Sequence, residues 1–358
     1  MTQAAVPMTM GVSASPFVSD EVIDPLRAMR LRYPGGAPEV TRDPLGCRHE
    51  SARASNRHPR RTRCRRGGCR DLRAGPLKRF LTLAALLIGS AAAVMSAAPA
   101  AVASDASLVC RFSDKRFTEI SGLASSIRHP GVLYLHNDSG DGPFIYAVDA
   151  KTCATLATLT IRGASMRDAE AIATGRDEQG RAVIWFADIG DNLDSWPFVK
   201  IYEIREPKRL ANTTVDATAF RFTYGDIPHN AEALLANPAK PQLWVVTKQL
   251  AHGSLYRLPE PLRSGVVNIA SKIRREGGLV TDGAVSPDGL RYVLRDYDDA
   301  YVYAGLPPGR KIATIPLPFQ LQGEAITWAP DGRSLLIASE RDKRLLRVTL
   351  PMSAMAVR

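Results

Sequence analysis

The chain has 358 residues, of which 45% are hydrophobic and 23% are charged, a composition typical of a globular protein with one large domain or two. Its formal net charge of +11 is unevenly placed: residues 1–103 carry 16 Lys and Arg against 7 Asp and Glu, whereas residues 104–358 carry 31 against 29. The later part is close to neutral, so bulk positive charge is excluded as its means of binding, and nucleic acid is not expected as a partner.

Residues 1–77 are predicted to be a disordered leader. They show no sustained hydrophobic period and contain a basic run from His58 to Arg66, so they cannot bury enough apolar surface to offset the entropy of ordering. The alternatives are a nucleic-acid-binding arm and a zinc site of His58, Cys64 and Cys69. The Cys-x4-Cys spacing lacks a second matching pair, which argues against the metal.

Residues 78–103 have the order of a secretory signal peptide. A basic pair at 78–79 precedes an apolar run from Phe80 to Ile88, and an Ala-Val-Ala cleavage pattern precedes Ser104. Because a signal belongs at a chain start, residues 1–77 would come from a start codon assigned too far upstream, or from a long genuine leader.

An uncleaved anchor is the alternative, because the apolar stretch from Leu81 to Ala103 is long enough to span a bilayer. In both cases the positive flank stays inside. We therefore expect a secreted or extracytoplasmic domain over residues 104–358, with no stable membrane span if the signal is cleaved. Two of the five Cys, Cys110 and Cys153, fall in this domain. They are predicted to form a disulfide, the alternative being two unpaired buried thiols.

Five internal repeats organise the exported domain. Each begins with a short segment that aligns with the others without gaps, at spacings of 49, 62, 51 and 41 residues. The segments are Ile120–Ala124, Ala169–Ala173, Ala231–Leu235, Asp282–Ser286 and Gly323–Thr327. Such spacings suit the four-stranded blades of an all-β propeller.

Each repeat continues with a turn rich in Pro and Gly, a continuous apolar run and a third strand. The fifth repeat ends after three strands, and Ser107–Phe112 is the candidate for its missing outer strand. Pairing of the two ends would close the ring and remove two exposed edges. We therefore predict five four-stranded blades closed by an N-terminal strand, with six blades, one of them degenerate, as the alternative.

Polar residues recur at two positions of the repeats. The start of the first strand carries Glu170, Glu232 and Glu324, with Asp168, Asn230 and Asp282 beside them. The second strands end at Asn137-Asp138, Asp188, Lys248, Arg295-Asp296 and Glu340. In an antiparallel hairpin these two positions are neighbours, so we expect all of these side chains on one face of the disc, near its axis.

Two loops with Gly between carboxylates strengthen this prediction. Asp138-Ser-Gly-Asp141 matches Asp188-Ile-Gly-Asp191, and such a tight turn can direct carboxylate oxygens to a hard cation such as calcium. The alternative is that these acids accept only backbone N–H bonds. Three basic residues, Arg167, Lys248 and Arg295, would either neutralise the acids or bind an anionic ligand such as a phosphate ester.

The Glu-Ala-(Ile/Leu) and Ser-Pro-Asp-Gly repeats, with Asp188-Ile-Gly-Asp-Asn192, resemble those of secreted bacterial propeller proteins of actinobacterial, WD40-like type, over residues 107–350. More distantly they are similar to the β-propeller phytases and the esterase-like phytases, in which acids of the top face hold calcium. The matching metal ligands here would be Glu170, Asp188, Asp191, Glu232, Asp282 and Glu324. Ser121 and Gly283 depart from the acidic pattern, which puts a full multi-metal site in doubt.

The sequence therefore predicts a monomeric binding or scaffold propeller with an acidic, calcium-holding central pocket, whose partner is a small anionic ligand or a protein. The alternative that the phytase likeness implies is a metal-dependent hydrolase of phosphate or carboxylate esters. No Gly-x-Ser-x-Gly elbow or His-Glu-x-x-His segment occurs. Whether the protein is an enzyme stays open at this point.

Overall fold

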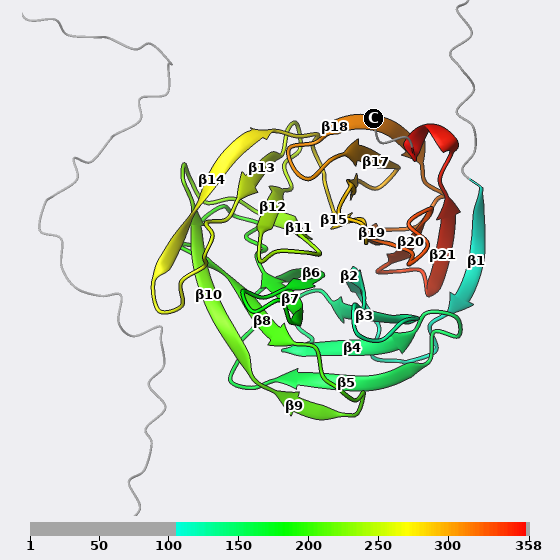
Figure 1. The fold of residues 1–358 in the computed structure, drawn as a ribbon, viewed down its shortest axis with the longest axis horizontal. Coiled ribbons are helices and arrows are strands. Elements are labelled where there is room, and N and C mark those ends of the chain that lie inside the picture. Colours follow the sequence, from blue (N-terminus) through cyan, green and yellow to red (C-terminus); the bar gives the residue numbers. More distant parts are fainter. Residues whose placement is uncertain (1–104, 356–358) are drawn as a thin grey trace, which may run out of the picture. The chain divides into compact units, whose positions relative to one another are not determined.

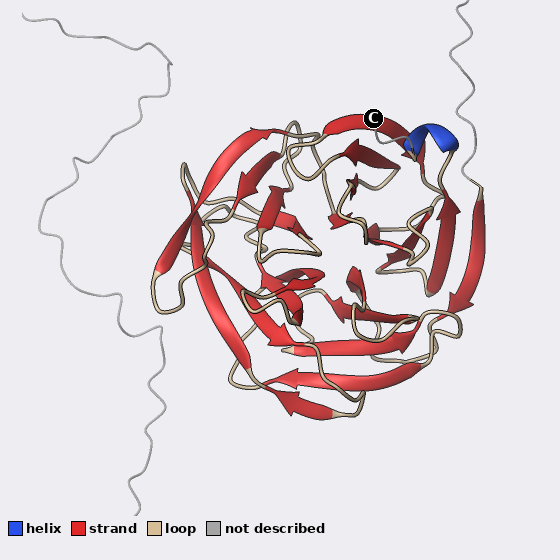
Figure 2. Cartoon of the chain, in the orientation of Figure 1, coloured by secondary structure: helices blue, strands red, loops and turns tan. Residues whose placement is uncertain are grey.

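The computed structural model describes residues 105–355, so the predicted leader over 1–77 and signal peptide over 78–103 lie outside the described residues. The described part consists of strands and one short 3-10 helix, η2 (Met352–Ala354) (Figure 2). Within it, no helix has the length and apolar character needed to cross a membrane.

A ring of inner strands surrounds the centre of the domain (Figure 1). These strands are β2 (Ile120–Ser125), β6 (Ala169–Arg176), β11 (Ala231–Ala236), β15 (Asp282–Val285) and β19 (Gly323–Trp328). Each contacts the next in chain order, and β19 contacts β2, so the ring is closed. They begin at or within one residue of the repeat segments that the sequence indicates.

Further strands pair outward from each inner strand. The second strands are β3 (Val132–Asn137), β7 (Ala182–Asp188), β12 (Leu243–Thr247), β16 (Arg291–Arg295) and β20 (Ser334–Ser339). The third strands are β4 (Phe144–Asp149), β8 (Val199–Arg205), β13 (Ser254–Arg257), β17 (Asp299–Ala304) and β21 (Arg344–Thr349). The outer strands are β5 (Thr155–Ile161), β10 (Ala217–Tyr224), β14 (Val267–Arg275), β18 (Arg310–Pro316) and β1 (Ala106–Arg111). The prediction of an all-β propeller is confirmed. The antiparallel pairings sort these strands into five groups of four, numbered here from the group of β2, and a parallel pairing of β10 with β14 joins the second and third groups into one eight-stranded sheet.

The second strands explain why the groups pack into a disc. Every residue of β3, β7, β12, β16 and β20 is buried, as expected for strands covered on both faces. Five hydrophobic clusters fill the space between the groups, and each combines residues of two neighbouring groups. One of them joins Leu133 of the first group to Leu336 of the last.

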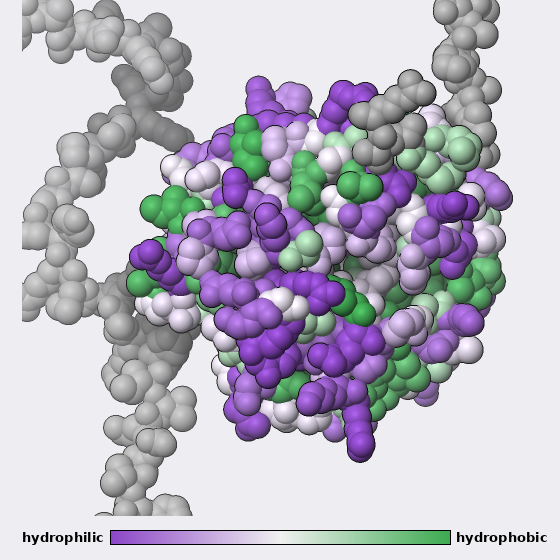
Figure 3. All heavy atoms as spheres, in the orientation of Figure 1, coloured by the Kyte–Doolittle hydropathy of each residue, from purple (hydrophilic) through white to green (hydrophobic). Residues whose placement is uncertain are grey.

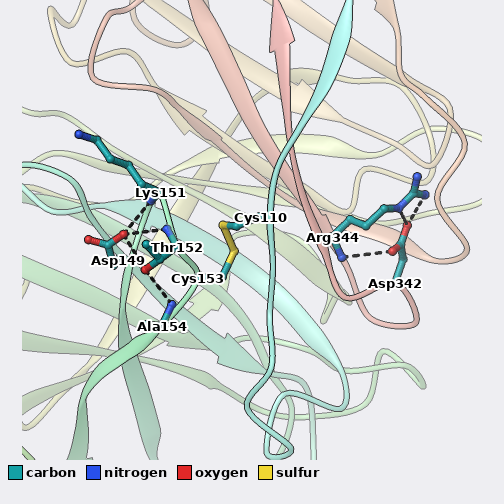
Figure 4. The surroundings of a disulfide bond; sticks show 8 residues. All are labelled: Cys110, Asp149, Lys151, Thr152, Cys153, Ala154, Asp342 and Arg344. Carbon is teal, nitrogen blue, oxygen red and sulfur yellow. Dashed lines mark hydrogen bonds and ion pairs between the residues drawn. A yellow bond between two sulfur atoms is a disulfide. The ribbon is translucent and has the colours of Figure 1, made fainter.

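Two contacts tie the N-terminal strand to both ends of the ring. β1 pairs antiparallel with β21 of the last group. Cys110 of β1 also forms a disulfide with Cys153, which lies in the turn between β4 and β5 of the first group, with 5.8 Å between their Cα atoms (Figure 4). The predicted closure and the predicted disulfide are therefore both confirmed.

The repeat pattern did not indicate two parallel pairings at the rim. A short strand, β9 (Thr213–Val215), pairs parallel with β5, and β10 pairs parallel with β14. These pairings cover strand edges that would otherwise be open. Both use the segment between the second and third repeats, where the spacing of 62 residues is the longest. Figure 3, in the same orientation, shows hydrophilic side chains over much of one face, with hydrophobic ones gathered at the lower right and scattered singly elsewhere.

Candidate functional site

A β-bulge positions the residue that recurs at the start of each inner strand. In four groups the register shifts around that residue, so it is the extra one in its strand. The bulged residues are Ser121, Glu170, Glu232 and Glu324, and all four are buried. In β15 the equivalent Gly283 pairs directly with Leu294 without a shift. A bulge changes the direction in which the side chain of its extra residue points. In three of the four bulged strands that side chain is a glutamate, so the bulges gather acids at this end of the inner strands.

Three carboxylates from two groups meet here, and we call Asp138, Asp168 and Glu170 the acidic cluster. One oxygen from each lies within 4.8 Å of the others. Asp138 follows β3, Asp168 immediately precedes β6, and Glu170 is the bulged residue of β6. Burial, followed by the charges of neighbouring carboxylates, raises the pKa of Asp168 to about 6 and that of Glu170 well above its ordinary value.

Lys248 neutralises the acids on the other side of the ring. Its Nζ lies 2.7 Å from Glu232 Oε2 and 3.8 Å from Glu324 Oε1. Burial by itself lowers the pKa of Lys248, but the Glu232 carboxylate outweighs it and the net pKa is raised. Burial raises the pKa of Glu232 to about 7 although Lys248 opposes this change. Glu170 makes no ion pair among the described residues, and its Oε2 accepts a 3.3 Å bond from Ser121 Oγ.

Glu340 extends the acidic surface beyond Glu324. It follows β20, and burial together with a hydrogen bond to the Glu324 carboxylate raises the pKa of Glu340 to about 8. Arg341 Nε lies 3.8 Å from Glu340 Oε2. The Tyr297 hydroxyl donates a 3.4 Å bond to Glu324 Oε1. Glu232 and Glu340 can therefore change protonation state near neutral pH.

Asp188 and Asp191 hold the loops around the acidic cluster. Asp188 Oδ1 accepts the backbone N–H of Arg167 at 2.7 Å and that of Asp168 at 2.8 Å. Asp191 Oδ2 accepts the backbone N–H groups of Ser195 and Trp196. Each carboxylate therefore uses at least one oxygen to accept backbone N–H groups. This agrees with the alternative interpretation of the sequence, in which these acids stabilise loops.

Arg167 is held against the loop that follows Asp191. Its Nε lies 3.6 Å from Asp188 Oδ2, and its guanidinium lies 3.7 Å from the centroid of the Trp196 ring. One guanidinium nitrogen also donates to the Phe198 carbonyl. The side chain is thus packed between an acid and an aromatic ring, beside the acidic cluster.

Asp282 and Arg295 are wholly buried inside the ring. Asp282 accepts the N–H of Ile326 in β19 and that of Gly283, both at 2.7 Å. Burial raises the pKa of Asp282 well above its ordinary value. Arg295 donates to the Ala325 carbonyl at 3.1 Å, and burial lowers the pKa of Arg295 to about 10. These two residues join β15 and β16 to β19.

The structure therefore brings together some of the residues singled out in the sequence and separates others. Glu170, Glu232, Glu324 and Lys248 lie on one acidic surface, together with Asp138 and Asp168, which the sequence placed nearby without assigning them to the metal. The two carboxylates of the Asp138-to-Asp141 loop have different surroundings, because Asp141 accepts bonds from Asn137 and Tyr146. The repeat pattern places Asp138 and Asp168 at the two recurring polar positions of the repeats, but the resemblance to the phytases assigns the metal to the acids that match theirs.

Comparisons with known proteins give little on function. No protein-family model matches the chain, and no curated protein matches it in sequence. Among solved structures, a gluconolactonase from Xanthomonas campestris is similar at 15% sequence identity, with a TM-score of 0.38, over 65% of this chain and 72% of that chain. The proposed function therefore rests on the geometry of the site.

Proposed function

We propose that this protein is a binding propeller that holds a divalent cation, calcium, at the acidic cluster and binds a small anionic ligand through it. The observation that carries this proposal is the meeting of three carboxylates from two strand groups, with oxygens within 4.8 Å of one another. Carboxylates this close repel one another unless protons or a cation balance them. Burial, followed by the charges of neighbouring carboxylates, raises the pKa values of Asp168 and Glu170.

The donor set suits a hard cation. Asp138 accepts a bond from Ser139, Asp168 from Asn192 and Glu170 from Ser121. Each carboxylate keeps a second oxygen that accepts no hydrogen bond from a side chain or backbone of the described residues. Oxygen ligands of this kind are those that calcium prefers, and neighbouring waters or a ligand oxygen would complete its six to eight positions. An anion would bind the exposed side of the cation.

Calorimetric titration of the full chain with calcium chloride tests the proposal. We expect binding, and a higher melting temperature, because a ligand bound only by the folded state stabilises it. Asp168→Asn and Glu170→Gln should each weaken calcium binding about tenfold or more, since a ligand charge is lost. Asp216→Asn is the matched control, because Asp216 forms a solvent-exposed ion pair with Arg162 and lies outside the acidic cluster. Absence of both heat and a melting shift at millimolar calcium would exclude the cation site.

Hydrolysis of phosphate or carboxylate esters is the second candidate function. The observation that favours it is the pair of groups with pKa values near neutrality, Glu232 at about 7 and Glu340 at about 8. Such groups suit general acid and base roles beside a metal-bound ester. Calcium-dependent release of nitrophenol from p-nitrophenyl acetate or phosphate, lost in Glu340→Gln, would support an enzyme. If nitrophenol is released no faster than in buffer, only the binding function remains supported.

Export from the cytoplasm is part of the same proposal. The signal-like order of residues 78–103 suggests it, and the disulfide between Cys110 and Cys153 supports it because disulfides persist in oxidising compartments. Terminal sequencing of the protein recovered from the medium should start at or near Ser104. A mature product that still carries residues 1–75 would contradict both the cleavage and the upstream start codon.

A further inference from the structure

A cavity lies at the other end of the inner strands from the acidic cluster. It has a volume of about 280 Å³ and is lined by the later residues of β2, β6, β11, β15 and β19. The bulged residues are the second residues of their strands, Asp168 immediately precedes β6, and Asp138 follows β3, whose end pairs with the start of β2. Because all five strands of the ring contribute to the lining, this cavity lies on the central axis, at the end opposite the acidic cluster.

Small side chains create this cavity. Four inner strands each place an alanine on its wall, and these are Ala124, Ala173, Ala236 and Ala284. Larger apolar side chains, including Leu123, Ile172 and Trp328, complete the wall, and the turns that follow three inner strands add Pro238, Pro287 and Pro330. A ring of five strands leaves a space at its centre, and alanine does not fill that space.

The cavity has one charged lining residue, Arg176, and no carboxylate lines it among the described residues. One guanidinium nitrogen of Arg176 donates to the Gly180 carbonyl at 2.9 Å, and Arg176 forms no ion pair with any described residue. The Glu206 carboxylate accepts bonds from the Ile127 and Arg128 N–H groups and from Ser126 Oγ, and it forms no ion pair with Arg176. The remaining N–H groups of Arg176 are therefore available to an anion.

Four hydroxyl-bearing residues, Ser125, Ser126, Thr174 and Thr327, add polarity to the wall. Thr174 Oγ1 donates to the Ser125 carbonyl, and Ser125 Oγ donates to the Trp328 carbonyl. Each hydroxyl oxygen can still accept a bond. The wall is thus mainly apolar, with a cationic group and a few hydroxyls, which is the usual chemistry of a pocket for a small organic molecule.

We propose that this cavity is a second binding site, for a small amphiphilic carboxylate whose apolar body fills the alanine-lined hollow and whose carboxylate pairs with Arg176. A planar guanidinium binds a carboxylate through two parallel hydrogen bonds, which gives both strength and orientation. The volume of about 280 Å³ limits the ligand to roughly the size of an aromatic acid with one or two rings. The site is separate from the proposed cation site and does not depend on it.

Binding of 2-naphthoate to the full chain tests this proposal. Calorimetry should show binding, and the indole N–H signal of Trp328 should shift in NMR spectra while that of Trp196, which lies near the acidic cluster, stays in place. The neutral analogue 2-naphthalenemethanol should bind about tenfold or more weakly, because it cannot form the charged pair. Equal affinity of the two compounds would refute the role of the carboxylate.

Variants separate the contribution of the Arg176 charge from that of the cavity volume. Arg176→Gln should weaken naphthoate binding about tenfold while leaving the alcohol unchanged, and Arg205→Gln, which changes an exposed arginine outside the cavity, should alter neither. Ala284→Leu should abolish binding of both compounds by filling the hollow. Asp168→Asn should weaken calcium binding but leave naphthoate binding intact. The cation site and the cavity site can therefore be refuted independently of each other. No detectable binding of either compound at millimolar concentration would overturn the proposal.

Discussion

At the scale of single residues, the acidic end of the axis carries more negative than positive charge. Lys248 lies between Glu232 and Glu324, whereas the three carboxylates of the acidic cluster share no lysine or arginine ion pair among the described residues. Asp188 and Asp191 accept backbone N–H groups instead, so these two acids fix loops, unlike the acids of the acidic cluster. The protonation states of these residues therefore determine how stable the ring is and what it can bind.

Replacing Lys248 with methionine should destabilise the protein by about 3 kcal/mol at pH 8, because it leaves buried carboxylates without their partner. The loss should be smaller at pH 5.5, where a proton on Glu232 can take the place of the ammonium charge. Urea unfolding at both pH values measures this difference. The exposed Lys240→Met is the matched control and should change stability little at either pH. An equal loss at both pH values would show that Lys248 acts by packing.

The second residue-scale prediction concerns Asp282, which accepts N–H groups of both β15 and β19. Asp282→Ala should cost about 3 kcal/mol, because two buried donors lose their acceptor. Asp282→Asn keeps one oxygen and should cost less. Chemical denaturation gives the comparison, with Asp216→Ala on the surface as the control. A neutral result for the alanine variant would mean that other groups satisfy these donors.

At the scale of elements, the ring is joined at β1. Pairing with β21 attaches this strand to the last group, and the disulfide attaches it to the first group (Figure 4). Phe112, immediately after β1, packs in the cluster that contains residues of both groups. A single strand therefore holds the two ends of the ring together through hydrogen bonds, a covalent bond and apolar contacts.

Deletion of residues 106–112 should produce aggregation, because it exposes the edge of β21 and opens the cluster between the first and last groups. The matched control is the double variant Cys110→Ser with Cys153→Ser, which removes only the disulfide. That control should remain monomeric and lose about 2–4 kcal/mol of stability. Size-exclusion chromatography and thermal melting distinguish the two. A deletion variant that elutes as a monomer with a normal melting temperature would show that β1 is dispensable.

At the scale of the whole molecule, the two ends of the axis differ in chemistry. One end gathers carboxylates with raised pKa values, and the other forms an apolar hollow with Arg176 in its wall. The buried side chains of Asp282 and Arg295 lie inside the ring and form hydrogen bonds with the backbone of β19. The two proposed sites are therefore separate, and we expect the charge of the acidic end to affect the stability of the ring.

Without calcium, stability should fall as the pH rises from about 5 to 8. The pKa values of Asp168, Glu232 and Glu340 rise on folding to about 6, 7 and 8, so the folded state holds protons that the unfolded chain releases near pH 4. Their contribution is fully present below the unfolded pKa values and is lost as the pH passes through the folded ones. Melting temperatures in EDTA measure the fall.

Calcium should reverse this trend at pH 8, because it replaces the lost protons. The double variant Asp168→Asn with Glu340→Gln should show a flatter dependence on pH. A melting temperature that rises steadily from pH 5 to 8 in EDTA would contradict the assigned directions of these pKa changes.

The sequence alone determined the features that depend on repetition along the chain. Apolar runs, turn residues and five aligned segments predicted the strands, and a fifth repeat with three strands predicted the pairing of Ser107–Phe112 with the chain end. Two Cys within residues 104–358, the part that the sequence predicts to be exported, predicted the disulfide. These features follow from local periodicity and from the need to bury apolar faces and cover edges, which a single sequence displays.

Only the tertiary structure decided which acids meet and what the other end of the axis forms. The β-bulges at Glu170 and Glu232 change side-chain direction in a way that no residue pattern indicates. Asp138 and Asp168 lie 30 positions apart in the sequence, and the packing of neighbouring groups brings them together. The apolar cavity is likewise made by alanines from separate repeats. Each is unremarkable in its own strand, because the space they leave exists only when the five inner strands close into a ring.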